Sequence, residues 1–282
     1  MQHGILQRRA KSIFRTGHLL QMDLGLKDKL IVVTGGGAGI GRGISRACLA
    51  EGARIVVLAR HSQNVDDFMT EMKSAKAKCD FVEAQLEDTE RCRTAIAEIE
   101  QKYGDIFGLV NNAGVNDGVG LASGNIEAFM QSLKKNLVHN YALAHYALAS
   151  LKKTKGAIVN ISSKVAMTGQ GNTSGYAASK GAQLALTREW AAELLKDGIR
   201  VNAVLPAEVM TPLYERWLKT LGDPDAKLRE ITGKIPLGHR MTTQAEIAAA
   251  TVFLLSPTQS GHTTGQHILV DGGYVHLDRA LT

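Results

Sequence analysis

Ser163, Tyr176 and Lys180 are side chains of the types and spacing that acid–base chemistry on an alcohol requires. Tyr176 and Lys180 are four residues apart, so on a helix they lie on one face. A free phenol has a pKa of about 10, and a nearby ammonium group favours the phenolate and lowers that pKa. The Ser163 hydroxyl can both donate and accept. Together the three can take a proton from an alcohol while its carbon loses a hydride, although Tyr and Lys alone are equally well explained as a solvated helix pair.

A glycine-rich turn stands between a predicted strand and a predicted helix. Residues 30–33 are a continuous apolar run, which is typical of a strand covered on both faces. The run leads into TGGGAGIG at 34–41, and apolar residues at helical spacing follow. Glycine lets a pyrophosphate approach the backbone, and the helix N-terminus offers it free N–H groups. A glycine cluster alone is as often a flexible turn, but a strand before and a helix after are the context that a dinucleotide site needs.

These motifs resemble those of the short-chain dehydrogenases/reductases in order and spacing. The glycine motif, the NNAG segment at 111–114, Ser163 and the Tyr176–Lys180 pair all occur, and the resemblance covers roughly residues 24 to 276. It implies that Ser163 orients the substrate oxygen and that Tyr176 is the general acid/base. It also implies that Lys180 lowers the tyrosine pKa and binds the nicotinamide ribose. Asn136, in KKNLVHN, matches the asparagine that holds water in the family's proton relay.

The same resemblance implies a nicotinamide cofactor. The glycine motif would hold its pyrophosphate, the NNAG segment would lie beside the adenosine, and residues 206–211 would bind the nicotinamide amide. The residues expected at the cofactor are Gly35, Gly37, Gly39, Ile40, Arg60, Gln85, Leu86, Asn112, Ala113, Gly114, Tyr176, Lys180, Pro206, Val209 and Thr211.

The end of the second predicted strand bears on the choice between NADP and NAD. An acid there would bind the adenosine 2′-hydroxyl, as in NAD sites, but Ala59 takes that position and Arg60 follows. A guanidinium pairs with a 2′-phosphate, so we expect NADP in preference to NAD. Ala38 stands where NADP enzymes of the family often have a second basic residue, and Arg42 could help one turn later. Gln85 replaces the family's aspartate at the adenine amine, and its amide oxygen can still accept that hydrogen bond.

Polar residues near the predicted reaction centre indicate a hydroxyl-rich substrate. The candidates for substrate binding are Asn116, Asp117, Gln170, Glu208 and Trp217. Each of the four polar residues alone is better explained as a loop or cap residue, whereas Trp217 is expected to line the pocket rather than only to fasten the lid. As a set, the segments VNNAGVNDGVGL, SSKVAMTGQGNTSGY, PAEVMTPLY and GGYVHLDRAL are similar to those of bacterial L-fucose dehydrogenases within the family. That similarity implies hydride transfer from the anomeric carbon of a sugar such as L-fucose to the nicotinamide, which gives a lactone.

Two alternatives stay open. A reductase of 3-oxoacyl thioesters or hydroxysteroid-type carbonyls would need an apolar pocket, for which the candidates are Met167, Met210, Leu213, Tyr214 and Trp217. A dinucleotide sensor would keep the fold without the chemistry, but such chains usually lack part of the triad that this chain keeps. The histidines at 262, 267 and 276 do not stand with acids at metal-ligand spacing, so we expect no metal site.

Strand-like and helix-like stretches alternate along the 282 residues, which predicts an α/β fold. We expect a single-domain Rossmann fold, a doubly wound seven-stranded parallel sheet with helices on both faces. The expected strands are 30–34, 55–59, 79–83, 107–111, 156–161, 199–204 and 267–271. The expected helices are 40–51, 63–76, 88–102, 125–151, 175–196 and 243–255. Residues 206–236 interrupt this rhythm with four prolines and are expected to form a substrate lid.

Charge separates a basic head from the rest of the chain. Residues 1–22 carry four of the basic residues and no acid, so the net charge of +6 leaves 6 − 4 = +2 for the domain expected over 23–282. Such a domain lacks the basic footprint of a nucleic-acid-binding protein. The head is expected to be disordered or to precede a true start at Met22, with a transit-like segment as the alternative.

Composition also bounds the setting of the protein. No run of eighteen apolar residues occurs, so no membrane span is expected. Cys48, Cys79 and Cys92 are an odd number of cysteines without metal spacing, which favours reduced thiols and a cytoplasmic protein. The family resemblance implies a homo-tetramer that pairs through the helices at 125–151 and 175–196.

Overall fold

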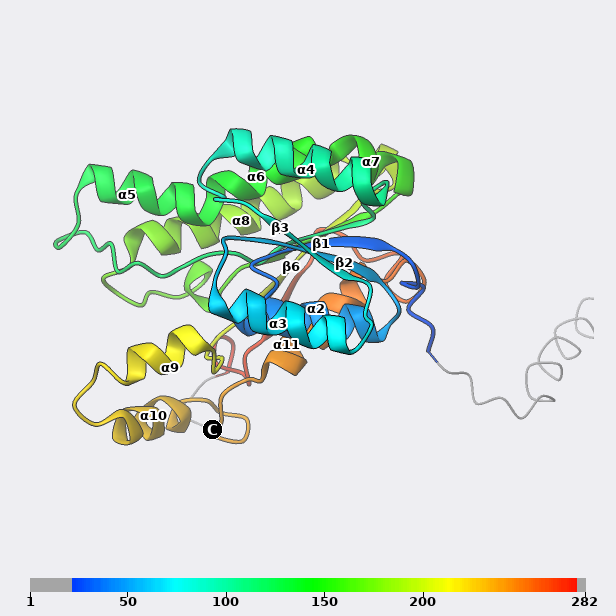
Figure 1. Cartoon of the computed structure of the whole chain (residues 1–282). Coiled ribbons are helices and arrows are strands. Elements are labelled where there is room, and N and C mark those ends of the chain that lie inside the picture. The colour runs from blue at the N-terminus through cyan, green and yellow to red at the C-terminus, as the bar shows by residue number, and fades with distance from the viewer. Residues whose placement is uncertain (1–21, 278–282) are drawn as a thin grey trace, which may run out of the picture.

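Seven parallel strands form the sheet of this computed structural model, which describes residues 22–277 (Figure 1). The strands are β1 (Leu30–Thr34), β2 (Arg54–Ala59), β3 (Cys79–Glu83), β4 (Gly108–Asn111), β5 (Ala157–Ile161), β6 (Arg200–Pro206) and β7 (His267–Val270). Their order in space is β3-β2-β1-β4-β5-β6-β7, so β1 lies between β2 and β4. The predicted doubly wound Rossmann fold is confirmed, and the strand order reverses beside β1, where ligands of such sheets bind.

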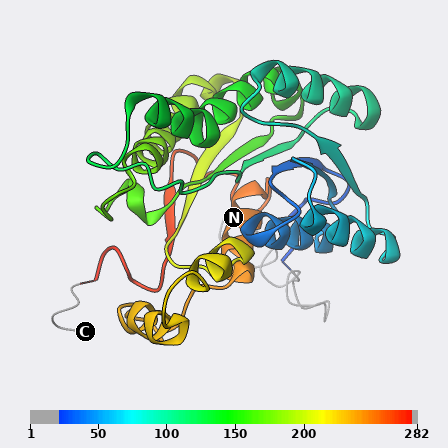
Figure 2. The same ribbon diagram turned by 60° about the vertical axis from the view of Figure 1, so that its left-hand side comes forward.

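Helices cover both faces of the sheet (Figure 2). One face carries α2 (Gly39–Ala50), α3 (Gln63–Ser74) and α11 (Gln244–Leu255). The other carries α4 (Thr89–Tyr103), α6 (His139–Tyr146), α7 (Leu148–Thr154) and α8 (Ser174–Glu193). Successive strand side chains point to opposite faces, so Ile31 and Val33 belong to the first core, and Leu30 and Val32 to the second. All-apolar strands are therefore needed to fill both cores.

The helix expected over 125–151 is interrupted. It consists of α5 (Ile126–Leu133), a π-helical turn (Lys134–Val138), α6, a break at Ala147, and α7. The π turn carries Asn136, whose side chain bonds the backbone of Val115 and Ser132. Such turns often occur at functional sites, and hydrophobic periodicity does not reveal them.

Residues 206–236 contain more regular structure than predicted. They include α9 (Pro212–Leu218) and α10 (Pro224–Gly233), which lie together beyond the carboxyl ends of the strands (Figure 1). Each helix starts with proline, and the side chain of Thr211 or Asp223 caps its first turn. Proline suits the first helical position, where its missing N–H costs nothing. Two of the prolines that signalled a break therefore begin helices.

The structure describes neither end of the chain. The basic head lies, apart from Met22, outside the described residues, as does the segment 278–282. Within 22–277 no helix is long and apolar enough to cross a membrane. In the same range no cluster of His, Cys, Asp or Glu has the composition to hold a metal ion.

Candidate active site

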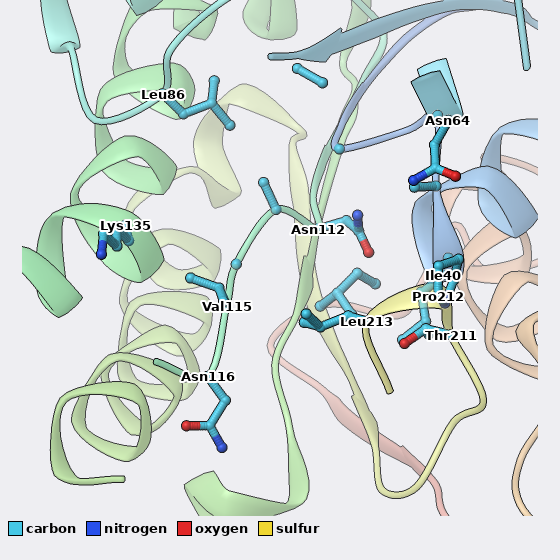
Figure 3. A pocket seen from close by; sticks show the side chains of 18 of the residues that line it. Ile40, Asn64, Leu86, Asn112, Val115, Asn116, Lys135, Thr211, Pro212 and Leu213 are labelled. Carbon is cyan, nitrogen blue, oxygen red and sulfur yellow. The ribbon is translucent and has the colours of Figure 1, made fainter. Parts of the chain in front are cut away.

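A cleft of about 640 Å³ lies at the carboxyl ends of the central strands. Every residue predicted at the cofactor lines it, from Gly35 in the glycine turn to Thr211 before α9. Asn112, Val115 and Asn116 follow one another along the loop after β4, with Ile40 and Thr211 on the opposite side (Figure 3). The sequence separates these groups by as much as 176 residues (35 to 211), and the fold brings them to one cavity.

The glycine turn has the shape of a phosphate cradle. Gly35 has a φ of +64°, which glycine adopts without strain, and a Cβ on Gly41 would lie 2.3 Å from the carbonyl oxygen of Gly35. Helix α2 starts after Ala38, which provides no side-chain cap. The first N–H groups of α2 are thus left for an anion, so these residues fit the pyrophosphate of a nicotinamide cofactor.

Thr34 fixes the NNAG segment against β1. Its hydroxyl accepts hydrogen bonds from the backbone N–H groups of Asn112 and Ala113, both at 2.9 Å. The Asn112 amide donates to the Thr34 carbonyl oxygen at 2.8 Å. These bonds join the ends of two neighbouring strands and set one wall of the cleft.

The predicted triad comes together from two elements. Ser163 follows β5, and Tyr176 and Lys180 lie in the first two turns of α8, all lining the cleft. The Lys180 ammonium donates to the Ile161 carbonyl oxygen at 2.7 Å and lies 5.5 Å from the centre of the Tyr176 ring. The phenol of Tyr176 hydrogen-bonds the Ser163 hydroxyl. This arrangement can hold an alcohol oxygen and exchange its proton.

Burial dominates the proton affinities of this group. Burial raises the pKa of Tyr176 to about 12, and the hydrogen bond from Ser163 offsets only part of that rise. Burial also lowers the pKa of Lys180 to about 7. Desolvation disfavours the charged form of each group. The expectation that Lys180 lowers the tyrosine pKa stays a prediction.

Asn136 lies behind the cleft rather than in its lining. Its side-chain oxygen accepts from the Val115 backbone N–H at 2.7 Å, and its side-chain nitrogen donates to the Ser132 backbone oxygen at 3.0 Å. The backbone oxygen of Asn136 accepts from the Gln183 side-chain amide at 2.9 Å. Gln183 is buried, and its amide oxygen lies 3.3 Å from the Lys180 ammonium. Gln183 thus connects Asn136 to Lys180 directly, while the predicted relay water stays a prediction.

Sequence reasoning missed Gln183. The only signal was a polar residue three positions after Lys180, among residues that α8 buries.

Of the five predicted substrate residues, Asn116 alone lines the cleft. Its amide oxygen accepts from the Thr173 hydroxyl at 2.6 Å. Asp117 instead accepts from Ser132 at 2.8 Å. Gln170 is exposed on its loop, outside the lining. Short polar side chains in loops find local partners first, which residue type alone does not reveal.

The other two predicted substrate residues, Trp217 and Glu208, do not line the cleft but contact Tyr214, which does. Trp217 packs edge-on against Tyr214, with ring centres 5.2 Å apart, and 43% of it is exposed. Glu208 pairs with Lys164 and accepts from the Tyr214 hydroxyl at 2.8 Å. Its carboxylate is thereby occupied by protein partners, so a direct bond from Glu208 to a substrate would have to displace one of them.

The two arginines proposed at the adenosine end differ. Arg60 lines the cleft, and no ion pair holds it within the described part of the chain. Arg42 bonds Glu71 at 2.5 Å and lies over the Phe68 ring, 5.4 Å from its centre. The expectation that Arg42 helps to bind a 2′-phosphate is not supported, because its guanidinium is engaged elsewhere.

Known proteins share both the sequence and this fold. The family model described as enoyl-(acyl carrier protein) reductase matches residues 35–275. The chain is 37% identical to an L-fucose dehydrogenase of Bos taurus over 87% of this chain and 88% of that one. It is 32% identical to the 3-oxoacyl-[acyl-carrier-protein] reductase FabG of Thermotoga maritima over 89% and 99%. The L-fucose dehydrogenases found are mammalian, whereas the sequence resemblance pointed to bacterial ones.

Two solved structures extend the comparison. Cj0485 dehydrogenase superimposes with a TM-score of 0.88 at 44% identity, covering 93% of this chain and 99% of the other. Aldohexose dehydrogenase of Thermoplasma acidophilum gives a TM-score of 0.82 at 29% identity, covering 92% and 98%. These matches extend over almost the whole described range, cleft included.

Proposed function

Because the chain belongs to the short-chain dehydrogenase/reductase family and is an oxidoreductase acting on CH–OH donors, we propose that it oxidises the anomeric carbon of a sugar such as L-fucose to a lactone. The observation that carries this proposal is the similarity to an L-fucose dehydrogenase over 87% of the chain. Asn116 supports it, because a polar group in the cleft favours a substrate with hydroxyls to pair with it.

A bound nicotinamide would supply the hydride acceptor, and the residues of this chain would manage the proton. In the proposed reaction Ser163 holds the C1 oxygen, and Tyr176 as phenolate takes its proton while the C1–H electron pair leaves as hydride. Lys180 and Asn136 then pass the proton toward solvent. Positioned acid–base catalysis contributes typically about 10²–10⁴-fold, and orientation of the sugar supplies much of the rest.

A panel of aldoses with both nicotinamides tests the function. We expect turnover of L-fucose, D-arabinose or L-galactose, with lactone formation followed by mass spectrometry. Tyr176→Phe should lower kcat by at least about a hundredfold, because it removes the proton acceptor. No turnover of any of the three sugars would reject the sugar proposal. Undiminished activity of the phenylalanine variant would reject the role of Tyr176.

For the cofactor we propose NADP in preference to NAD, because Arg60 is available in the cleft. Arg60→Ala should lower kcat/KM with NADP at least about tenfold and change kcat/KM with NAD little, since the guanidinium would contact only the 2′-phosphate. Lys73→Ala, at an exposed position of α3, is the control. A hundredfold preference of the unaltered protein for NAD would contradict this assignment.

The alternative function is reduction of 3-oxoacyl thioesters, which the similarity to FabG favours. Of its five predicted apolar residues, Leu213 and Tyr214 line the cleft, whereas Met210 lies in a separate groove between α2 and α11. Turnover of acyl thioesters without turnover of sugars would establish this alternative.

We also propose that the protein is a cytoplasmic homo-tetramer and that residues 206–236 form its substrate lid. Exposed apolar side chains on α5 and α6, such as Met130 and Tyr141, support association through these helices. The three cysteines are free thiols, which agrees with a reducing compartment. The position of α9 at the cleft supports the lid.

A further inference from the structure

Four segments that are far apart in the sequence meet at Glu208. Lys164 comes directly after Ser163, Glu208 follows β6, Tyr214 lies on α9, and Tyr274 follows β7. One carboxylate oxygen of Glu208 pairs with the Lys164 ammonium, and the other accepts from the Tyr214 hydroxyl at 2.8 Å. The Lys164 ammonium also lies 4.1 Å from the centre of the Tyr274 ring. The two oxygens of Glu208 thus have separate partners on separate elements.

Burial distinguishes this ion pair from the others of residues 22–277. The side chains of Lys164 and Glu208 are 11% and 14% exposed, and in each other pair at least one partner is more accessible. Removing each charge from water costs several kcal/mol, and the attraction between the charges offsets this desolvation only if their geometry is good. A buried ion pair is therefore weak evidence that it stabilises the fold. We therefore look for the role of the Lys164–Glu208 pair in the residues whose positions it fixes.

The ion pair bears on two residues that line the cleft. Ser163 and Tyr214 both line the cleft, while Glu208 and Lys164 do not. Lys164 shares a peptide bond with Ser163, and Glu208 holds the phenol of Tyr214, against which Trp217 packs edge-on. The chain Ser163–Lys164–Glu208–Tyr214 therefore ties the lid helix α9 to the residue that would hold the substrate oxygen.

We propose that Glu208 and Lys164 are positioning residues that fix Tyr214 at a set distance from Ser163 and so define the space for a compact, hydroxyl-bearing substrate. Neither residue contacts the substrate. Each acts through Tyr214, which lines the cleft and against which Trp217 packs. The identity of the substrate rests on the proposed function, but the coupling between the lid helix and Ser163 does not.

Tyr214→Phe is the sharpest test, because it removes the hydroxyl that joins α9 to Glu208 and leaves the ion pair in place. We expect KM for the sugar to rise at least about tenfold, with KM for the cofactor within twofold of the unaltered protein and little change in Tm. Tyr103→Phe, at the end of α4 and outside the cleft lining, is the matched control and should change neither KM value.

Glu208→Gln and Lys164→Met form a double-mutant cycle with the same readout. Each single variant should raise KM for the sugar. The double variant should resemble the more affected single variant, because both substitutions break the same Lys164–Glu208 ion pair. If a single variant does not fold, Tyr214→Phe still tests whether the link between Glu208 and Tyr214 affects KM for the sugar.

Acrylamide quenching of tryptophan emission gives a readout that needs no substrate. The sequence has two tryptophans, and Trp190 is 7% exposed against 43% for Trp217, so quenching reports mainly on the lid helix. Release of Tyr214 should increase quenching in the Tyr214→Phe and Glu208→Gln variants.

A fall in Tm with unchanged KM for the sugar and unchanged quenching would show that the pair is only structural, and would overturn the proposal. Increased quenching in a protein that turns over no sugar would instead retain the coupling and reject the proposed function.

Discussion

Tyr176 and Lys180 show how burial changes the chemistry that residue types suggest. Proximity of an ammonium group alone would lower the tyrosine pKa, yet the pKa of Tyr176 is about 12 and that of Lys180 about 7. Lys180 is buried and Tyr176 is half-buried in the cleft wall, and desolvation there favours the neutral form of each. Alcohol oxidation needs the phenolate, so this raised pKa has a kinetic consequence.

We expect kcat/KM for oxidation to rise with pH from about 7 to 10 without levelling off. In this range, below its pKa of about 12, Tyr176 is mostly phenol, so each step in pH increases the small fraction of phenolate. At saturating cofactor, kcat/KM for the sugar reports the enzyme–cofactor complex, so its pH profile measures this group before the sugar binds. The reverse reduction needs the phenol and should show no such rise. A plateau in oxidation below pH 8 would contradict the raised pKa.

Helix α8 is the element that aligns the triad, and its start is packed tightly against α5. A Cβ on Gly175 would lie 2.5 Å from the Cβ of Ser132, which real atoms do not tolerate. Gly175 directly precedes Tyr176, so any shift that relieves this contact moves the phenol. The position of the proposed acid/base thus depends on a helix contact that the motif itself does not contain.

Gly175→Ala should therefore reduce both activity and stability. Overpacking of this kind typically costs about 1–3 kcal/mol, and we expect kcat/KM to fall at least about tenfold. Urea unfolding and steady-state kinetics measure the two effects. Gly233→Ala at the end of α10 is the control for stability, since an added Cβ there meets no described atom within 4 Å. Normal activity of the Gly175 variant would show that α8 can shift without moving Tyr176.

At the scale of the whole molecule, the start of the described chain is fastened to the segment after α11. The Ser256 hydroxyl donates to Leu24 O at 2.7 Å, and the Gln259 amide donates to Asp23 O at 2.9 Å. Leu26 is 1% exposed and belongs to the core between the sheet and α2, α3 and α11. Residues 23–26 thus contribute both hydrogen bonds and a buried side chain to the described domain.

A chain that starts at Met22 should keep the Tm and kcat of the full chain. A chain that starts at Asp28 should lose about 2–5 kcal/mol of unfolding free energy, because it lacks the buried Leu26 and both anchoring bonds. Thermal and urea unfolding of the two truncated proteins measure the difference. Equal stability of both would show that these contacts contribute little, and a large loss at Met22 would assign a structural role to residues 1–21.

The sequence by itself determined the sheet, the glycine turn and the triad. These features depend on local spacing: apolar runs that fill both faces of strands, glycine where the backbone needs a positive φ, and residues four apart on one helix face. For this reason the strand positions agree closely with the structure. The residues that the family resemblance implied at the cofactor line one cleft.

Only the tertiary structure decided which polar residues reach that cleft and how they ionise. Asn116 lines it, whereas Glu208 is held by Lys164, 44 residues earlier in the chain, and Gln183 joins Asn136, 47 residues away. The pKa direction of Tyr176 follows from burial by several elements at once. Partners distant in the sequence and exclusion of water are properties of the assembled chain, so no local spacing encodes them.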